Sequence, residues 1–149
     1  MVGKTSENYF SEAISEYEKR IKRYIPFEVI TIQDIKGIRD FEVQRGQEGD
    51  LILKNIREDD YVILLDERGE FFSSIAFAGH ISKISNNARK RIVFVIGGAY
   101  GFSEKVYDRA NEKISLSKMT FSHQLVRVVF TEQLYRAFTI INNQPYHHE

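Results

Sequence analysis

The apolar residues of this chain recur with two periods, one typical of helices and one typical of strands. From Ser6 to about Tyr24 they recur at helical spacing, which predicts a helix that Ser6 caps and Pro26 ends. Glu16–Arg20 and Glu18–Lys22 have the favourable orientation for ion pairs along such a helix. The chain therefore opens on an amphipathic helix.

Two short runs, Tyr61–Leu65 and Ile92–Ile96, are apolar at every position. A strand without a polar face is covered on both sides, which is the pattern of a parallel sheet between helices. Further elements alternate with these two, with strands at Phe27–Ile32 and Ile114–Ser117, and helices at Phe41–Ile56, after Ser73 or Ser74, after Ser103 and from His123 to Ile141. We predict a single α/β domain over residues 1–149, with a mainly parallel sheet and helices on both faces.

Apolar side chains also predict which helix faces are buried. In the helix after Ser73 or Ser74 the buried stripe should be Ile75, Ala78, Ile81 and Ile84. The last helix is apolar over much of its circumference, with Val126, Val128, Val129, Phe130, Leu134, Ala137, Phe138, Ile140 and Ile141. Such a helix must bury more than one face, and in a small chain we expect a partner subunit to cover the second.

Ligands of parallel sheets bind beyond the carboxyl ends of the strands. Three loops follow predicted strands, namely Asp66–Glu70, Gly97–Phe102 and Lys118–His123, and they should converge on one pocket. In Gly97–Gly101 the backbone can approach a ligand closely, although a plain structural turn is an equal alternative. The run matches neither the dinucleotide fingerprint nor a P-loop.

The segment Leu116–His123 mixes hydroxyl and apolar side chains. Such a mixture suits the wall of an adenine site, where backbone groups read the edge of the base. The alternative is an ordinary connection in which Ser122 caps the last helix. Both interpretations stay open on the sequence.

Charge and composition narrow the function classes. The 21 basic and 21 acidic residues cancel, which argues against non-specific coating of nucleic acid. Two local basic clusters, Lys19–Arg23 and Arg89–Arg91, are either RNA contacts or solvated helix ends. There is no charged-then-apolar leader, no apolar run of membrane-spanning length, no cysteine and no histidine spacing typical of a metal site. We expect a cytoplasmic protein that binds neither membrane nor metal.

Three stretches together resemble the SPOUT-class methyltransferases, specifically the ribosomal RNA large subunit methyltransferase H family. They are Val93–Gly98, Ser115–His123, and Leu125–Phe138 followed by Pro145-Tyr146-His147. The resemblance covers nearly the whole chain, and its specificity lies in the order and spacing of the stretches. It implies a trefoil-knotted α/β fold, a homodimer and S-adenosylmethionine as methyl donor. It also implies N3-methylation of a pseudouridine in an intersubunit hairpin of large-subunit (23S) ribosomal RNA.

The resemblance further implies which residues form the site. The cofactor-binding residues would be Leu65, Gly97, Leu116, Ser117, Lys118, Met119, Thr120 and Phe121, at the three loops already singled out. For the transfer we expect Arg127 or Arg136 to supply positive charge. His123, Tyr146 and His147 are expected to orient the base or relay its proton.

Zero net charge, combined with this resemblance, indicates a protein that acts on the assembled ribosome rather than on naked RNA. The alternatives are a SPOUT methyltransferase acting on transfer RNA, a ribosome-docking module without catalysis and, by fold analogy alone, a nucleotide-binding protein. The family has most of a first strand ahead of the segment that Met1–Thr5 matches. Either that strand lies outside this sequence or the sheet lacks it, which would leave backbone groups unpaired.

Overall fold

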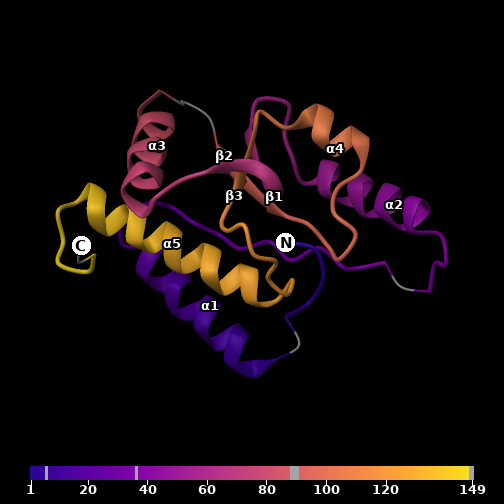
Figure 1. The fold of residues 1–149 in the computed structure, drawn as a ribbon, viewed down its shortest axis with the longest axis horizontal. Helices are drawn as coiled ribbons and strands as arrows, with labels where there is room; N and C mark the ends of the chain where they lie inside the picture. The colour runs from indigo at the N-terminus through magenta and orange to yellow at the C-terminus, as the bar shows by residue number, and fades with distance from the viewer. Residues whose placement is uncertain (6, 36, 88–90, 148–149) are drawn as a thin grey trace. The chain divides into compact units, whose positions relative to one another are not determined.

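The computed structural model describes residues 1–5, 7–35, 37–87 and 91–147 (Figure 1). The described helices and strands are α1 (Asn8–Ile21), α2 (Phe41–Lys54), β1 (Tyr61–Phe71), α3 (Ser74–Asn87), β2 (Ile92–Ile96), α4 (Glu104–Arg109), β3 (Glu112–Ser115) and α5 (Leu125–Ile141). The predicted cap Ser6, and Arg89 and Lys90 of the second basic cluster, lie outside the described residues.

The chain forms two compact units that alternate along the sequence. The first unit contains Met1–Lys4, Ile30–Glu70 and Lys90–Lys118, and therefore nearly all of the sheet with α2 and α4. The second unit contains Thr5–Val29, Phe71–Arg89 and Met119–Glu149, and therefore α1, α3 and α5.

The first unit is built on a three-stranded sheet with the order β2-β1-β3. β1 and β2 run parallel, in a register that pairs Tyr61 with Ile92 and Leu65 with Ile96. Because three consecutive residues of β1, Val62–Leu64, are fully buried, both faces of this strand are covered. The predicted α/β class is confirmed, and the trefoil knot stays a prediction.

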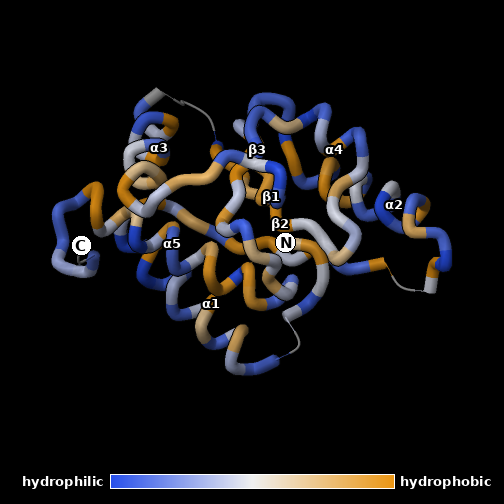
Figure 2. The backbone as a smooth tube through the Cα atoms, viewed as in Figure 1, coloured by the Kyte–Doolittle hydropathy of each residue, from blue (hydrophilic) through white to orange (hydrophobic). Residues whose placement is uncertain are grey.

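Helices α2 and α4 bury one set of sheet residues. Val62, Leu64 and Val95 form a core cluster with Ile52 of α2 and Val106 of α4, and the hydrophobic positions along β1 and β2 stand out in Figure 2. Glycine makes the contact between the two helices possible, since a Cβ atom on Gly49 would lie 2.1 Å from Ser103 Oγ. Although Gly46 and Gly49 both lie within it, α2 is continuous from Phe41 to Lys54, and Gly49 serves helix packing.

The predicted strand Phe27–Ile32 is wrong, because only Ile32 pairs, in an isolated parallel bridge with Val2. The amide of Ile32 donates to Met1 O at 2.8 Å and that of Gly3 donates to Ile32 O at 2.7 Å. Val2 N in turn donates to Ile96 O at 3.2 Å. Met1–Gly3 thus lies beside the end of β2. Because this segment is so short, the backbone around Ile32 has too few partner groups to form a longer strand.

Strand β1 is longer than predicted, since it continues through Asp66–Glu70 to Phe71. The sequence interpretation ended the strand where apolar residues stop, but the neighbouring strand β3 lies against this polar extension. A Cβ atom on Gly69 would lie 2.4 Å from the carbonyl carbon of Ile114, so only glycine allows this approach. Pairing rather than hydrophobicity therefore sets the end of β1. β3 itself covers Glu112–Ser115, two residues earlier than predicted.

In the second unit α5 packs against both α1 and α3 (Figure 1). Helix α1 buries Ile14 and Ile21 and ends before Pro26. The predicted ion pairs are formed, with Arg20 Nε 2.9 Å from Glu16 Oε1 and Lys22 Nζ 2.8 Å from Glu18 Oε1. Two faces of α5 are covered within the chain, so their burial does not itself require the partner subunit that the sequence suggested. The homodimer stays a prediction.

The prediction of the buried residues of α3 is confirmed at Ala78, Ile81 and Ile84. It is wrong at Ile75, which is 47% exposed. Phe77 is buried instead. Steps of three residues drift about 60° around a helix, so a stripe spaced only by threes leaves the buried face at one end. Ser73 caps the helix, because its hydroxyl accepts a hydrogen bond from Ala76 N at 3.2 Å.

Candidate functional site

Five of the eight predicted cofactor-binding residues lie in the first unit. Gly97 directly follows β2 and Leu116–Lys118 directly follow β3, but Leu65 lies inside β1. The predicted ligand loop Asp66–Glu70 is therefore wrong, because these residues continue the strand. Leu65 and Ile96 are paired in parallel register, so Gly97 follows at the same edge of the sheet as Leu65. On the other side of β1, β3 ends at Ser115 and continues into Leu116–Lys118. Leu65, Gly97, Leu116 and Ser117 are half-buried, and Lys118 is exposed. Ser115 Oγ donates to Ser117 O at 3.0 Å and so shapes the start of this last loop.

The segment after β2 is a tight turn. Gly101 N donates to Gly98 O at 3.3 Å, and Gly101 has a φ of +74°, which favours glycine. A Cβ atom on Gly98 would lie 2.7 Å from Glu48 Oε2, so the side chain of α2 touches the turn directly. This internal hydrogen bond fits the structural-turn alternative, and the approach of a ligand to the backbone here stays a prediction.

The other three predicted cofactor-binding residues, Met119, Thr120 and Phe121, belong to the second unit. Met119 is 78% exposed and Thr120 is also exposed, whereas Phe121 is half-buried. Ser122 Oγ accepts from Leu125 N at 3.3 Å, and Ser122 O accepts from Val126 N at 3.0 Å. Ser122 thus helps to cap α5, which is the alternative that the sequence left open for it.

The C-terminal tail folds back on α5. Asn143 has a φ of +52°, and Gln144 N donates to Thr139 O at 2.9 Å. A residue in the left-handed region is a common way to end a helix and reverse the chain. The reversal carries Tyr146 and His147 back to the side chains of the α5 residues Glu132 and Arg136.

These four side chains form a tail cluster, which we define as Glu132, Arg136, Tyr146 and His147. Glu132 Oε1 accepts from Arg136 Nε at 3.0 Å and from the Tyr146 hydroxyl at 3.2 Å. The guanidinium carbon of Arg136 lies 4.8 Å from the centre of the Tyr146 ring, and its Nη1 lies 3.4 Å from His147 Nδ1. Three of the predicted catalytic residues therefore come together, and the predicted Glu132–Arg136 ion pair is formed.

The surroundings of Arg136 and Tyr146 favour their protonated forms. The hydrogen bond from Arg136 to Glu132 raises the pKa of Arg136, so it stays cationic. Burial raises the pKa of Tyr146, and a hydrogen bond with Tyr17 and the charge of Glu132 raise it further. Because arginine only donates, its contact with His147 requires the Nδ1 lone pair and leaves the proton of a neutral ring on Nε2. The cluster therefore offers several hydrogen-bond donors.

The other predicted catalytic residues lie away from the tail cluster. Arg127 is on α5, about 13 Å from Arg136 along the axis by the rise of an α-helix. It is 0% exposed, and its Nη1 donates to Thr5 Oγ1 at 2.9 Å. His123 is exposed and precedes the helix. Arg136 is better placed than Arg127 to meet a substrate.

Sequence reasoning did not anticipate the aromatic residues around the tail cluster. The Tyr135 ring centre lies 4.8 Å from that of Tyr146 and 6.0 Å from that of Tyr17. Arg20 of α1 lies over the rings of Tyr17 and Tyr135, at 5.8 and 5.6 Å. The available signal was the seven-residue spacing of Tyr17 and Tyr24, which would share one face of the predicted helix, although α1 ends at Ile21, before Tyr24.

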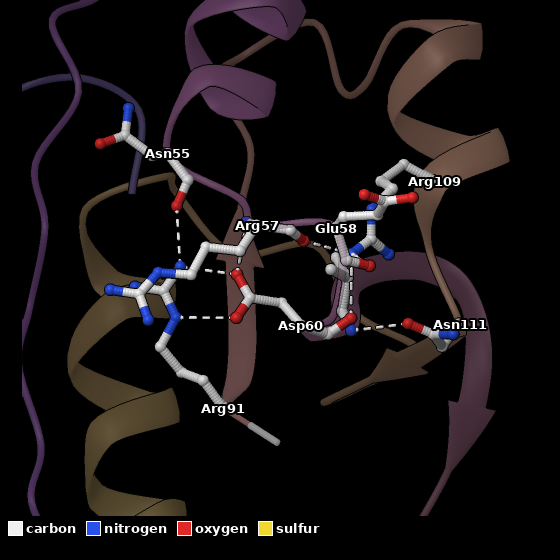
Figure 3. A network of polar contacts seen from close by, with 8 residues as sticks. Asn55, Arg57, Glu58, Asp60, Arg91, Arg109 and Asn111 are labelled. Carbon is white, nitrogen blue, oxygen red and sulfur yellow. Dashed lines mark hydrogen bonds and ion pairs between the residues drawn. The ribbon is translucent and has the colours of Figure 1, made fainter.

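The structure also accounts for part of each basic cluster. Arg20 and Lys22 are paired with acidic residues of α1, which favours the solvated-helix-end interpretation for these two, while Lys19 and Arg23 are exposed. Of Arg89–Arg91 only Arg91 is described, and it binds Asp60 through Nη2 to Oδ2 at 2.6 Å (Figure 3). That pair precedes β1 and β2, at the opposite end of the strands from Leu65 and Gly97.

No helix among the described residues combines the length and apolar character needed to cross a membrane. In that same part of the chain no group of three or more His, Cys, Asp or Glu side chains is arranged to hold a metal ion.

The chain is similar to known proteins over nearly its whole length. A family described as predicted SPOUT methyltransferase matches residues 1–147. The ribosomal RNA large subunit methyltransferase H of Parabacteroides distasonis is 54% identical, over 100% of this chain and 96% of that protein. The proteins of the same name from Christiangramia forsetii and Phocaeicola vulgatus are 53% and 51% identical, over 99% and 100% of this chain and 95% and 96% of their own lengths. The chain belongs to the SPOUT methyltransferase family, among the ribosomal RNA large subunit methyltransferase H proteins.

Proposed function

We propose that this protein transfers a methyl group from S-adenosylmethionine to N3 of a pseudouridine in an intersubunit hairpin of 23S ribosomal RNA. The observation that carries the proposal is the 54% identity, across the whole chain, to a protein named as a methyltransferase of large-subunit ribosomal RNA. The family resemblance is the basis for three details: S-adenosylmethionine as the methyl donor, N3 as the modified atom and the intersubunit hairpin as the substrate.

The edge of the sheet in the first unit fits an adenosyl group. Such a group needs apolar contact for its flat base and backbone groups for the polar edge of the base. Leu65 and Leu116 offer half-buried apolar side chains, and the half-buried backbone of Gly97, which lies beside the Phe102 ring, follows Ile96, the partner of Leu65. We assign these residues and Ser117 to the donor, with Lys118, Met119, Thr120 and Phe121 continuing the same loop.

The tail cluster suits the acceptor base. When bound, S-adenosylmethionine supplies a methyl group on a positively charged sulfur, and the receiving ring nitrogen must give up its proton to solvent water. Arg136 stays cationic and can stabilise the negative charge that this loss leaves on the base. Tyr146 keeps its proton, and His147 presents Nε2, so both can donate to ring oxygens and orient the base. Arg127 and His123 remain secondary candidates for the same roles.

Substitutions in the tail cluster test this assignment. We expect Arg136→Ala to lower kcat by about a hundredfold or more, the loss typical of a donor that stabilises developing charge. His147→Ala should also lower kcat, while the affinity for S-adenosylmethionine measured by calorimetry stays unchanged in both variants. Lys83→Ala, at an exposed position of α3 outside both basic clusters, is the control. Unchanged turnover in both cluster variants would remove Arg136 and His147 from the mechanism.

Two measurements separate the proposal from its alternatives. Mass spectrometry of 23S RNA from cells with and without the gene should show a methylated pseudouridine only when the gene is present. Loss of a modification from transfer RNA instead would indicate the transfer RNA substrate. Calorimetry without heat on addition of S-adenosylmethionine would indicate a docking module without catalysis.

The proposal includes a homodimer and the assembled ribosome as substrate. Exposed apolar side chains of the second unit support the dimer, among them Tyr9, Ile75 and Met119. Sedimentation equilibrium should give twice the chain mass of 17.4 kDa. A monomer at every concentration would contradict the dimer and leave the methyl-transfer proposal standing.

A further inference from the structure

Glu48 is a buried carboxylate on α2 that the proposed reaction does not use. It is 3% exposed, and its Oε1 accepts from Gln44 Nε2 at 3.0 Å and from Ile35 N at 3.4 Å. Both donors are neutral. Keeping a carboxylate buried is costly, and two hydrogen bonds from neutral donors do not by themselves account for its burial.

Its second oxygen faces the glycine turn. A Cβ atom on Gly98 would lie 2.7 Å from Glu48 Oε2 and 3.5 Å from Val2 Cγ1. Gly98 is therefore held between α2 and the segment that borders β2. The residue before it, Gly97, is the one assigned to the methyl donor.

The next residue of α2 contacts the other end of the same segment. Gly49 lies against Ser103, whose Oγ is buried and has no hydrogen-bond partner among the described residues. Ser103 is the N-cap of α4, directly after Phe102. Glu48 and Gly49 thus contact the segment 97–103 near both of its ends, and they restrict how the turn between them can move.

We propose that Glu48 is a positioning residue, which holds the turn Gly97–Gly101 in the shape that receives S-adenosylmethionine. This inference rests on the proposed function, since it concerns the same donor site. The carboxylate acts by shape: it fills the space beside the Cα atom of Gly98, while Gln44 and Ile35 hold its other oxygen in place.

The contact predicts a specific pattern in a double-mutant cycle. Glu48→Ala should weaken S-adenosylmethionine binding by about tenfold, because it frees the turn to move, and Glu48→Gln should retain wild-type affinity, because it keeps the shape. Gly98→Ala should weaken binding by a similar factor, because its methyl group meets the carboxylate. In the double variant Glu48→Ala/Gly98→Ala the new methyl group has space, so binding should be tighter than the two single losses combined predict.

Calorimetric titration with S-adenosylmethionine, supported by melting curves of the ligand-free variants, measures this pattern. Gly46→Ala is the matched control on α2, since no atom beyond its chain neighbours and the local helix backbone lies within 4 Å of its Cβ position. Wild-type affinity in folded Glu48→Ala, or strictly additive losses in the double variant, would overturn the positioning role. Because Glu48→Gln preserves the shape, a large loss of binding in that variant would also contradict it. If the wild-type protein itself bound no S-adenosylmethionine, the proposed function would fail rather than this inference alone.

Discussion

Two tyrosines of the first unit hold their protons more tightly than a free tyrosine. Burial and a hydrogen bond to Asp66 raise the pKa of Tyr107 to about 12. A hydrogen bond to Glu112, together with burial, raises the pKa of Tyr61 to about 12. In both cases a nearby carboxylate disfavours the charged phenolate.

This predicts a loss of stability at alkaline pH. The folded pKa lies above the ordinary value of 10, so the protonated tyrosines contribute stability that is complete below pH 10 and is lost as the pH rises toward about 12. Urea unfolding at increasing pH should show this fall. Tyr107→Phe should make it less steep, because one titrating group is gone, and an equally steep fall in that variant would contradict the assignment.

A second prediction at this scale concerns backbone contact at Gly69. A side chain there would meet the backbone of Ile114 at 2.4 Å, and the backbone of β3 cannot yield as a flexible side chain does. We expect Gly69→Ala to lower the free energy of unfolding by about 3 kcal/mol, at the upper end for overpacking. Gly79→Ala, in an exposed and open position of α3, should raise it by about 0.5 to 1 kcal/mol. Chemical denaturation measures both, and equal effects would show that the contact does not matter.

At the scale of elements, the segment before β1 is held by two arginines (Figure 3). Arg91 binds the buried Asp60 with two hydrogen bonds, of 2.9 and 2.6 Å. Arg109 Nη2 donates to the carbonyl oxygens of Arg57, Glu58 and Asp60 at 2.7, 3.1 and 2.9 Å. Since Arg91 precedes β2 and Arg109 ends α4, the network ties three elements of the first unit together.

Breaking this network should destabilise the fold. The hydrogen bonds from Arg91 hold the pKa of Asp60 below its usual value, so the stability that this carboxylate contributes is present above that value and is lost as the pH falls through the lowered pKa. Asp60→Ala should cost about 3 kcal/mol near neutral pH, because it removes the partner of Arg91 and the acceptor of Arg57 N. Denaturation curves at neutral and acidic pH should show the difference shrinking in acid. A constant difference would contradict the ionic role.

The elements that could be predicted are those with a strong local pattern. Ile92–Ile96 and the last helix, apart from its first residues, were found because their apolar runs and periodicity are visible in the sequence. The extension of β1, the single bridge at Ile32 and the burial of Arg127 depend on which segments become neighbours, which no local pattern reveals. The same holds for the site. The adjacency of Leu65 and Gly97 follows from parallel strands, whereas the contact of Glu48 with Gly98 arises only from tertiary packing.

At the scale of the whole molecule, charge bears on the choice of substrate. The 21 basic and 21 acidic residues leave no net attraction for a bare polyanion. We therefore expect weak or no methylation of an isolated hairpin transcript and efficient methylation of assembled ribosomes that lack the modification. Transfer of a radioactive methyl group to each substrate measures this. Efficient methylation of the transcript would refute the requirement for a shaped particle.

The alternation of the two units along the chain has a consequence for biosynthesis. β1 has no parallel partner until the residues through Ile96 have been synthesised, and α1 cannot dock on α5 until those through Ile141 have been. Contacts so distant in sequence form slowly, because a long loop must lose conformational entropy on closing before the contact can stabilise it. The nascent polypeptide therefore emerges with uncovered apolar helix faces, and chaperones that shield such surfaces should bind it during translation.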